Sequence, residues 1–330
     1  MPIPELLTEA PPEPPVDVAL RCGEPQRHGG ITIVPLLLAA APVRAYITLD
    51  EAAVHGFHIE EVGAGGRVPE LLVHNPLPHD VLLYDGEEVV GAKQNRVLEA
   101  SVLVPAATTQ TIPVACVEAG RWHDLGDGFR ASDRVADPEV RRRKAADLER
   151  APLARGSSQA SVWEAVDERI HASAVESSTR ALSDVHEFER PRVDAIADAF
   201  PAVPDQCGAI LALGSDLCLD YVSRPEAWTA LWPKVRRGYL LDGLRCLDDD
   251  PTAPELVAAF ATAIAAAPAT RQPSPGLGID ARLHGRDVSG AALVVDGETV
   301  QLSAYSRRQR DHVGIMLGER AVLRPSRRRR

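Results

Sequence analysis

The stretch from residue 82 to residue 122 constrains the fold of this chain more than any other. Apolar runs flank Asp85-Gly86, a dipeptide that tolerates the positive φ of a type I′ turn, so this pattern predicts a tight hairpin. Two more apolar runs follow, over residues 97–104 and 111–117, and turn-forming residues end both. The stretch therefore predicts three or four β-strands in close succession.

Two dense polar segments interrupt these strands. Their residues, which we take as the candidate site, are Lys93, Gln94, Asn95, Arg96, Glu118, Arg121 and Trp122. Four large polar residues in a row cannot alternate between a core and solvent. They belong to a strand end or a loop, and loops held by a rigid sheet often carry function.

The residue types of this cluster suit a phosphorylated, ring-bearing ligand. An arginine such as Arg96 or Arg121 offers a bidentate fork for phosphate. The amides of Gln94 and Asn95 can read a base edge or ribose hydroxyls, and the indole of Trp122 can stack on an adenine ring. The same cluster also fits a second interpretation, an internal polar network that locks a sheet to the helical part, with a glutamate paired to an arginine.

Glu118 and Lys93 are the candidate catalytic residues. A desolvated glutamate can act as a general acid or base. Only three of the 36 basic residues are lysines, namely Lys93, Lys144 and Lys234. An ammonium group can shift its pKa where a guanidinium cannot, so a lysine inside the densest motif favours function. We attribute Lys144, which lies in an arginine-rich run, to chance.

Several longer motifs resemble the ADP-ribosylglycohydrolase- and rhodanese-phosphatase-associated protein domain family. They are DGEEVVGAKQNR, LVPA, IPVACVEAGRW, SSQASVW, ALSDVHEF and LWPKVRRGYLLDGL. The resemblance covers about residues 29–306. It implies a protein that binds an ADP-ribose-like or other phosphorylated nucleotide, with processing of that ligand left open. The alternative that it implies is a non-catalytic partner or scaffold for ADP-ribose-processing enzymes. It assigns no cofactor.

Composition narrows the class of protein. The net charge of −11 argues against nucleic-acid binding by the folded body. No run of 18 apolar residues predicts a membrane span, and the N-terminus lacks a secretory pattern. Five scattered cysteines without CxxC spacing suit reduced thiols in a cytoplasm. The pairs His55 and His58, and His74 and His79, predict no metal site, because no further ligand pair completes a tetrahedral set.

The order of elements predicts an α+β protein. We expect residues 1–15 to form a disordered Pro-rich tail and residues 16–123 to form a β-rich part, a sandwich or open barrel. Residues 124–306 form an α+β part, with helices and hairpins, that packs on the first part. Residues 307–330 form a basic C-terminal tail.

Several C-terminal elements have clear sequence signals. We expect helices over residues 138–150, from Ser158 as the N-cap, and after Pro191. The clearest helix begins at Pro225 and carries Trp228, Trp232 and Tyr239 on an apolar face, which predicts core packing. Asp242 ends that face and needs a polar partner. Hairpins are expected at residues 214–216 and 296–297, the latter with the turn chemistry of Asp85-Gly86.

Overall fold

The structure of the protein, a computed structural model, describes residues 19–39, 42, 44–63, 65–122, 128–150 and 158–308. The tail predicted for residues 1–15 lies outside the described residues, as do residues 309–330 of the basic tail. The first two residues of that basic tail are described. Nη2 of Arg307 lies 2.5 Å from Oε1 of Glu149, and Nη2 of Arg308 lies 2.6 Å from Oδ2 of Asp216.

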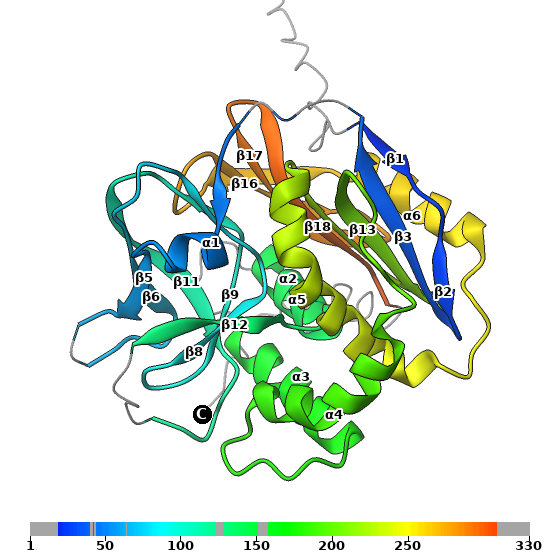
Figure 1. Ribbon diagram of the computed structural model, residues 1–330, viewed down its shortest axis with the longest axis horizontal. Coiled ribbons are helices and arrows are strands. Elements are labelled where there is room, and N and C mark those ends of the chain that lie inside the picture. The colour runs from blue at the N-terminus through cyan, green and yellow to red at the C-terminus, as the bar shows by residue number, and fades with distance from the viewer. Residues whose placement is uncertain are drawn as a thin grey trace, which may run out of the picture.

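The described strands form three sheets (Figure 1). A closed barrel contains β5 (His58–Glu61), β6 (Glu70–Asn75), β8 (Glu87–Gly91), β9 (Arg96–Leu98), β11 (Thr108–Cys116) and β12 (Phe129–Val135). A small sheet contains β4 (Ile47–Thr48), β7 (Val81–Leu83) and β10 (Val102–Val104). A large sheet contains β1 (Leu20–Cys22), β2 (Gln26–His28), β3 (Ile31–Leu38), β13 (Gln206–Leu213), β14 (Asp216–Val222), β15 (Ala269–Pro273), β16 (Ile279–His284), β17 (Val288–Val295) and β18 (Glu298–Ser306).

The helices cover these sheets and join them. They are α1 (Leu49–Ala53), α2 (Pro138–Arg150), α3 (Gln159–Ala172), α4 (Leu182–Ala197), α5 (Pro225–Gly243), the 3-10 turn η1 (Leu244–Cys246) and α6 (Pro254–Ala265). Figure 1 shows the barrel on one side, the large sheet on the other, and α5 running across the large sheet. The predicted α+β class is confirmed, and the N-terminal barrel is closed.

The two faces of the large sheet pack against different helices, as the alternation of side chains along a strand requires. Ile33 and Leu211 face α5 and share a core with Trp228. Val34 and Ile210, their neighbours in sequence, lie in a separate core on the other face, which also contains residues of α6. Because β3 pairs with β13, the first three strands, β1 to β3, belong to the same sheet as the C-terminal strands.

The turn at Asp85-Gly86 is present, but the hairpin predicted there is wrong. The N–H of Glu87 donates to the Tyr84 carbonyl at 3.0 Å, and Gly86 has a φ of 81°. The flanking strands β7 and β8 belong to the small sheet and to the barrel, respectively. A type I′ turn needs positive φ at both central residues, and Asp85 lacks it. The turn therefore sends the chain from one sheet into another.

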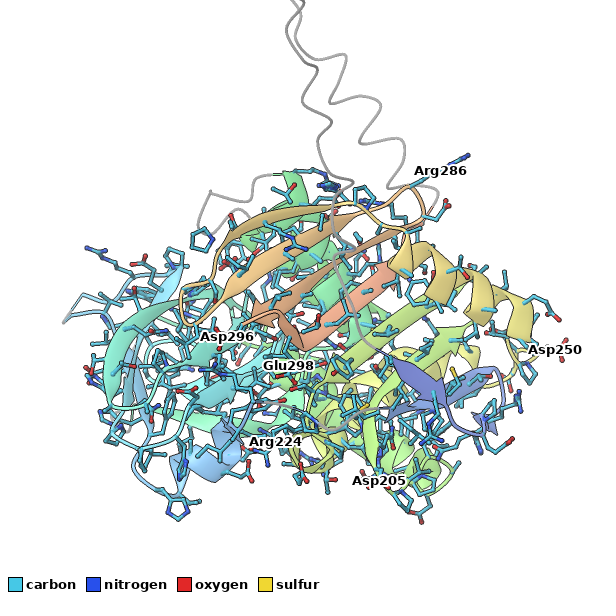
Figure 2. The ribbon with its side chains drawn as sticks, turned by 90° about the horizontal axis from the view of Figure 1, so that it is seen from above. Asp205, Arg224, Asp250, Arg286, Asp296 and Glu298 are labelled. Carbon is cyan, nitrogen blue, oxygen red and sulfur yellow. The ribbon has the colours of Figure 1, made fainter. Side chains whose placement is uncertain are left out.

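The hairpin predicted at Asp296-Gly297 is confirmed. Both residues have positive φ, 51° and 84°, and β17 and β18 pair on either side. Asp296 and Glu298, labelled in Figure 2, also bind Arg44, which precedes the small sheet. Since Nη2 of Arg44 donates to Asp80 at 2.8 Å as well, this hairpin ties the large sheet to the chain around β7.

The predicted helices are present, with two corrections. The helix at residues 138–150 is confirmed as α2. Ser158 stands at the N-cap of α3, but its hydroxyl donates to the Glu99 carboxylate and accepts no hydrogen bond from the N–H groups of the helix. The helix expected after Pro191 begins earlier, at Leu182, and contains the proline. Burial of Leu182 and Val185 in the core outweighs the local penalty of that proline.

Helix α2 carries two buried cations on its inward face. Arg141 and Lys144 are both 1% exposed, and their spacing of three residues places them on the same side of the helix. Arg141 pairs with Asp220 of β14, and Lys144 pairs with Asp85 of the β7–β8 turn. Lys144, attributed to chance above, therefore fills a closed site in which it also donates to the Leu98 carbonyl at 2.8 Å.

His186 of α4 is buried, and its environment makes the stability of the protein depend on pH. Burial, together with the charge of the neighbouring Arg134, lowers the pKa of His186 to about 3, although Asp133 opposes the shift. Arg169 and Arg190 also disfavour the imidazolium form. In the unfolded chain the His186 imidazole binds a proton near pH 6.5, whereas in the folded chain it stays neutral at that pH. The free energy of unfolding therefore decreases as the pH falls below 6.5.

We expect the His186→Gln variant to lose part of this acid sensitivity. Between pH 7 and pH 5 the difference in pKa corresponds to about 2 kcal/mol of unfolding free energy. Urea unfolding of parent and variant at both pH values measures it, and His171→Gln, at an exposed histidine of α3, is the matched control. A variant that loses as much stability as the parent between the two pH values would contradict the assignment to His186.

Candidate functional site

The polar segment Lys93–Arg96 lies in the loop between β8 and β9 and continues into β9. Lys93 is partly exposed, whereas Gln94, Asn95 and Arg96 are buried. The apolar strands on either side close into the barrel, so the chain must accommodate these polar side chains at the end where the barrel meets the helices. The segment therefore lies largely in a loop, as predicted, but three of its four side chains are buried.

Arg121 is the centre of this cluster. Its Nε and Nη2 donate to Oε2 of Glu118 at 2.9 and 2.6 Å. Nη1 donates to the Ala92 carbonyl at 2.6 Å, and Nη2 also lies 3.1 Å from Oδ1 of Asn95. One buried guanidinium therefore holds the β8–β9 loop against the segment that follows β11.

Glu118 accepts hydrogen bonds from both segments. Besides Arg121, the backbone N–H of Asn95 donates to its Oε2 at 3.1 Å, while Nε2 of Gln94 donates to its carbonyl oxygen at 2.8 Å. Burial alone would raise the pKa of Glu118, but the hydrogen bonds from Arg121 and from the backbone N–H of Asn95, with the charge of Arg121, outweigh burial and lower it. At neutral pH Glu118 is thus an ionised acceptor.

The same segment connects the barrel to α4. The N–H of Gly120 donates to the Thr179 carbonyl at 2.7 Å, and the N–H of Leu182 donates to the Val117 carbonyl at 3.0 Å. The hydrogen-bonded set of Gln94, Asn95, Glu118 and Arg121 consequently has the form of the network considered above as the second interpretation.

The remaining three members gather around one indole ring. Trp122 is 49% exposed. Nζ of Lys93 lies 5.5 Å from the centroid of the Trp122 ring, and Cζ of Arg96 lies 5.7 Å from it. Arg96 is fully buried, and within the described residues its Nε and Nη2 have no hydrogen-bond partner. The structure thus brings two cations to a single half-exposed aromatic surface.

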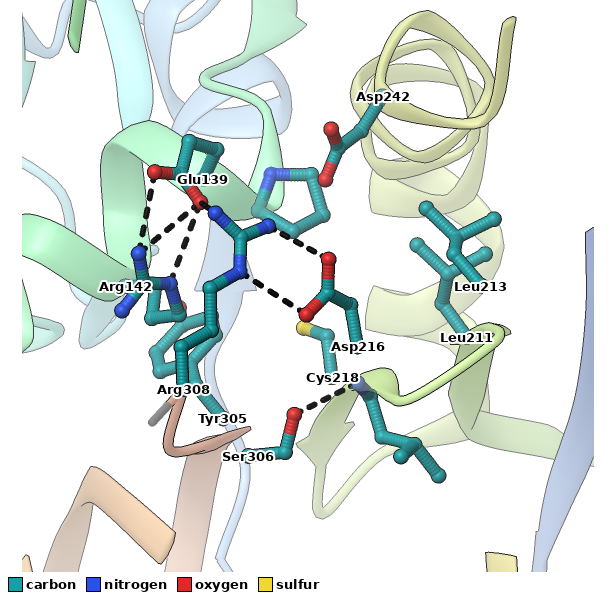
Figure 3. Close-up of a pocket in the computed structure, with 12 residues that line it drawn as sticks. Glu139, Arg142, Leu211, Leu213, Asp216, Cys218, Asp242, Tyr305, Ser306 and Arg308 are labelled. Atoms are coloured by element: carbon teal, nitrogen blue, oxygen red, sulfur yellow. Dashed lines mark hydrogen bonds and ion pairs between the residues drawn. The ribbon is translucent and has the colours of Figure 1, made fainter. Parts of the chain in front are cut away.

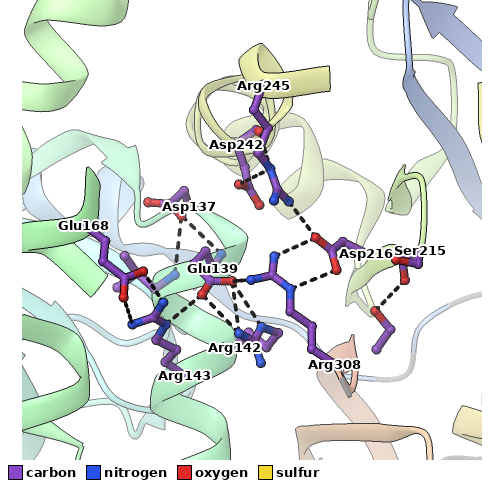
Figure 4. A network of polar contacts seen from close by, with 12 residues as sticks. Asp137, Glu139, Arg142, Arg143, Glu168, Ser215, Asp216, Asp242, Arg245 and Arg308 are labelled. Atoms are coloured by element: carbon purple, nitrogen blue, oxygen red, sulfur yellow. Dashed lines mark hydrogen bonds and ion pairs between the residues drawn. The ribbon is translucent and has the colours of Figure 1, made fainter. Parts of the chain in front are cut away.

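A second polar cluster, which sequence reasoning missed, lies where α2 and α5 meet the β13–β14 turn (Figure 4). Arg308 bridges Asp216 and Glu139, at 2.6 and 2.8 Å. Arg169 bridges Asp137 and Asp242, at 2.6 Å each. The partner predicted for Asp242 is therefore found. The other members carried no sequence signal, because their partners lie far apart in the chain.

A cavity of about 150 Å³ opens beside this second cluster. It is lined by Glu139, Ala165, Glu168, Arg169, Ala172, Arg245 and Arg308. Each of its arginines already binds a carboxylate, so its wall carries balanced charge. The adjoining pocket shown in Figure 3 measures about 20 Å³, room for about one water molecule. We assign this cluster to the packing of α2 against α5.

The structure also gathers possible metal ligands on the barrel. Among the described residues, His58, Glu60 and His74 place one ligand atom each within 4.8 Å of the others. Sequence spacing could not find this group, because the histidines come from two strands that meet only through sheet pairing.

Comparison with known proteins identifies the family. No curated protein and no solved structure matches the chain. No helix within the described ranges is long and apolar enough to cross a membrane. The model of the ARG and Rhodanese-Phosphatase-superfamily-associated Protein domain, ARPP-1, matches residues 19–305. The name associates the domain with ADP-ribosylglycohydrolases and the rhodanese-phosphatase superfamily. Because the match covers most of the chain, this protein belongs to the ARPP-1 family.

Proposed function

We propose that this protein binds a phosphorylated nucleotide of the ADP-ribose type at the surface formed by Trp122, Lys93 and Arg96. The observation that carries the proposal is the half-exposed indole with two cations beside it. Such a ring stacks on a nucleobase, and a neighbouring ammonium attracts phosphate. The family association with ADP-ribosylglycohydrolases supports the choice of ligand.

The three residues have different parts in this proposal. Trp122 and Lys93 are the groups that a ligand can touch, because both have exposed surface. Arg96 lies beneath them and contributes positive potential from a buried position. Burial lowers the pKa of Arg96, but a guanidinium keeps its charge at any physiological pH.

The buried network serves this surface as a support. Arg121 and Glu118 fix the loop that carries Lys93 and the segment that ends in Trp122. Gln94 and Asn95 complete that support, since both bond to Glu118. In this proposal Glu118 positions the loop, because its Oε2 already accepts hydrogen bonds from the backbone N–H of Asn95 and from Arg121. Five free cysteines fit a cytoplasmic setting for the protein.

Thermal melts with and without ADP-ribose test the proposal. A ligand at 100 times its dissociation constant stabilises the folded protein by about 2.7 kcal/mol. We expect Trp122→Ala to weaken binding about tenfold or more, since loss of one base stack costs about 1–3 kcal/mol. Lys93→Gln should weaken binding of ADP-ribose and ADP, and should leave the weaker binding of adenosine unchanged.

Two matched variants separate a local effect from a general one. Phe188→Ala removes an exposed aromatic side chain from α4, and Arg130→Gln removes an exposed cation from the barrel. Both should bind the ligand as the parent does. If ADP-ribose, ADP and AMP all leave the melting temperature of the parent unchanged, no such site exists.

The second candidate function is that of a non-catalytic partner or scaffold for ADP-ribose-processing enzymes. The specific observation in its favour is that Gln94, Asn95, Glu118 and Arg121 are hydrogen-bonded to one another in a buried network. Titration calorimetry with an ADP-ribosylglycohydrolase of the same genome tests it. The scaffold function would be favoured if the enzyme binds the parent but not Trp122→Ala, and if nucleotides leave the melting temperature of the parent unchanged.

A further inference from the structure

We propose that His58, Glu60 and His74 form a binding site for a divalent transition-metal ion on the outer surface of the barrel. The site does not depend on the nucleotide proposal. One nitrogen or oxygen atom of each side chain lies within 4.8 Å of the others, and all three side chains have exposed surface. An ion can therefore reach them directly from solvent.

The pairing of β5 with β6 builds this arrangement. His58 and His74 are direct cross-strand partners, so their side chains leave the sheet on the same face. Their rings stack with centroids 4.4 Å apart and planes 14° apart. Glu60 follows His58 by two residues and projects from that same face. Its Oε1 lies 2.9 Å from Nε2 of His74.

Hydrogen bonds favour the tautomer that a metal needs at His58 and allow it at His74. Nδ1 of His58 lies 3.2 Å from the carbonyl oxygen of Gly56. A carbonyl only accepts, so in the neutral ring Nδ1 carries the proton and Nε2 keeps its lone pair. Nδ1 of His74 lies 3.0 Å from Oγ1 of Thr109, its neighbour on β11. This hydroxyl can accept the Nδ1 proton and free Nε2 for an ion, as outer partners of metal-binding histidines do.

The donor set indicates the class of ion. Two imidazole nitrogens and one carboxylate suit Zn²⁺, Ni²⁺, Co²⁺ or Cu²⁺ better than Mg²⁺ or Ca²⁺, which prefer all-oxygen shells. Zinc binds such ligands at about 2.0–2.2 Å. A small rotation of the two rings out of their stack lets both Nε2 atoms approach one ion, which takes the place of the proton between His74 and Glu60. The remaining coordination positions face solvent and are filled by water.

Titration calorimetry of chelator-treated, tag-free protein with Zn²⁺ tests the site. We expect one ion per chain at these three ligands. His58→Ala, His74→Ala and Glu60→Gln should each weaken binding at least tenfold. Thr109→Val retains all three ligands but removes the hydroxyl beside His74, and should weaken binding about tenfold, the lower end of the range for lost outer partners.

His55→Ala and His79→Ala are the matched controls, because both remove exposed histidines near the cluster without touching it. They should bind Zn²⁺ like the parent. The visible absorption of bound Co²⁺ gives a second readout, which should disappear in the His58 and His74 variants while their thermal melts stay those of folded protein. Parent-like zinc binding by His58→Ala and His74→Ala, or no binding by the parent, would overturn the proposal.

Discussion

Asp220→Asn should lower the free energy of unfolding by about 3–5 kcal/mol, the usual cost of removing one partner from a buried ion pair. Asp220 is fully buried and Arg141 is 1% exposed. Nη1 and Nη2 of Arg141 donate to the two carboxylate oxygens at 2.8 and 2.6 Å, and the hydroxyls of Tyr239 and Ser303 donate to the same carboxylate. The amide of the variant has the same shape but removes the counter-charge that binds both Nη atoms of Arg141. The only carboxylate then left to the guanidinium among the described residues is Asp85, which lies 3.5 Å from Nε and is shared with Lys144.

Urea unfolding measures this loss, and two further variants establish its cause. The double variant Arg141→Met with Asp220→Leu removes both charges, and should regain part of the stability because no unpaired ion stays in the core. Asp147→Asn breaks the pair with Arg150, which is half-exposed, and should cost no more than about 1 kcal/mol. Equal losses for Asp220→Asn and Asp147→Asn would show that burial of the pair does not matter.

The contribution of the Asp220–Arg141 pair to the free energy of unfolding also depends on pH. Burial alone would raise the pKa of Asp220, but Arg141 and the hydroxyl of Ser303 outweigh burial and lower it to about 2. The pair therefore stabilises the protein above the unfolded pKa of about 3.9, and this contribution is lost as the pH falls toward 2. Asp220→Asn should lack this part of the acid transition.

Trp232→Ala should also cost about 3–5 kcal/mol, the range for large aromatic truncations in a core. The predicted burial of the α5 stripe is confirmed: Trp228 is fully buried and Trp232 is 2% exposed. The Trp232 ring lies 5.6 Å from that of Trp228 and 6.1 Å, edge-on, from that of Tyr239. Removing it opens a cavity between α5 and the sheet that the surrounding side chains cannot fill.

Denaturant midpoints of three variants decide this prediction. Trp232→Phe keeps an aromatic ring and discards an indole N–H that has no partner within the described residues, so it should lose less stability than Trp232→Ala. Trp122→Ala removes an exposed indole of equal size and should lose the least. A midpoint for Trp232→Ala equal to that of the parent would mean that the stripe is not part of the core.

Local patterns were sufficient to predict most elements of this fold. The apolar stripe from Pro225 and the turn at Asp296-Gly297 depend on neighbours in sequence, and both predictions are confirmed. Sheet membership was not predictable in this way. The dipeptide at Asp85-Gly86 looks the same as the one at Asp296-Gly297, yet it joins two different sheets because the apolar strands around it find better partners elsewhere.

The residues of the candidate site were chosen from the sequence, but the burial of most of them was not predictable. Sequence reasoning identified Lys93, Glu118 and Arg121. In the structure Arg121 binds Glu118 and also the carbonyl oxygen of Ala92, the residue before Lys93. Sequence reasoning could not tell that Arg121 and Glu118 would satisfy each other, because that depends on where the β8–β9 loop meets the end of β11. The buried ion pair of Lys144 was not predictable for the same reason, since its partner Asp85 is 59 residues away in sequence.

The place of β3 in the large sheet has a consequence for synthesis on the ribosome. Its apolar residues emerge early, yet 171 residues separate Leu36 of β3 from Cys207 of β13, whose thiol contacts its carbonyl. At about 5–20 residues per second, roughly 10–30 s pass before β13 can pair with it. During this interval β1 and β2 can pair with one edge of β3, but the other edge, which β13 covers in the folded protein, stays open. We therefore expect the nascent chain to be a client of ribosome-associated chaperones until β13 is made.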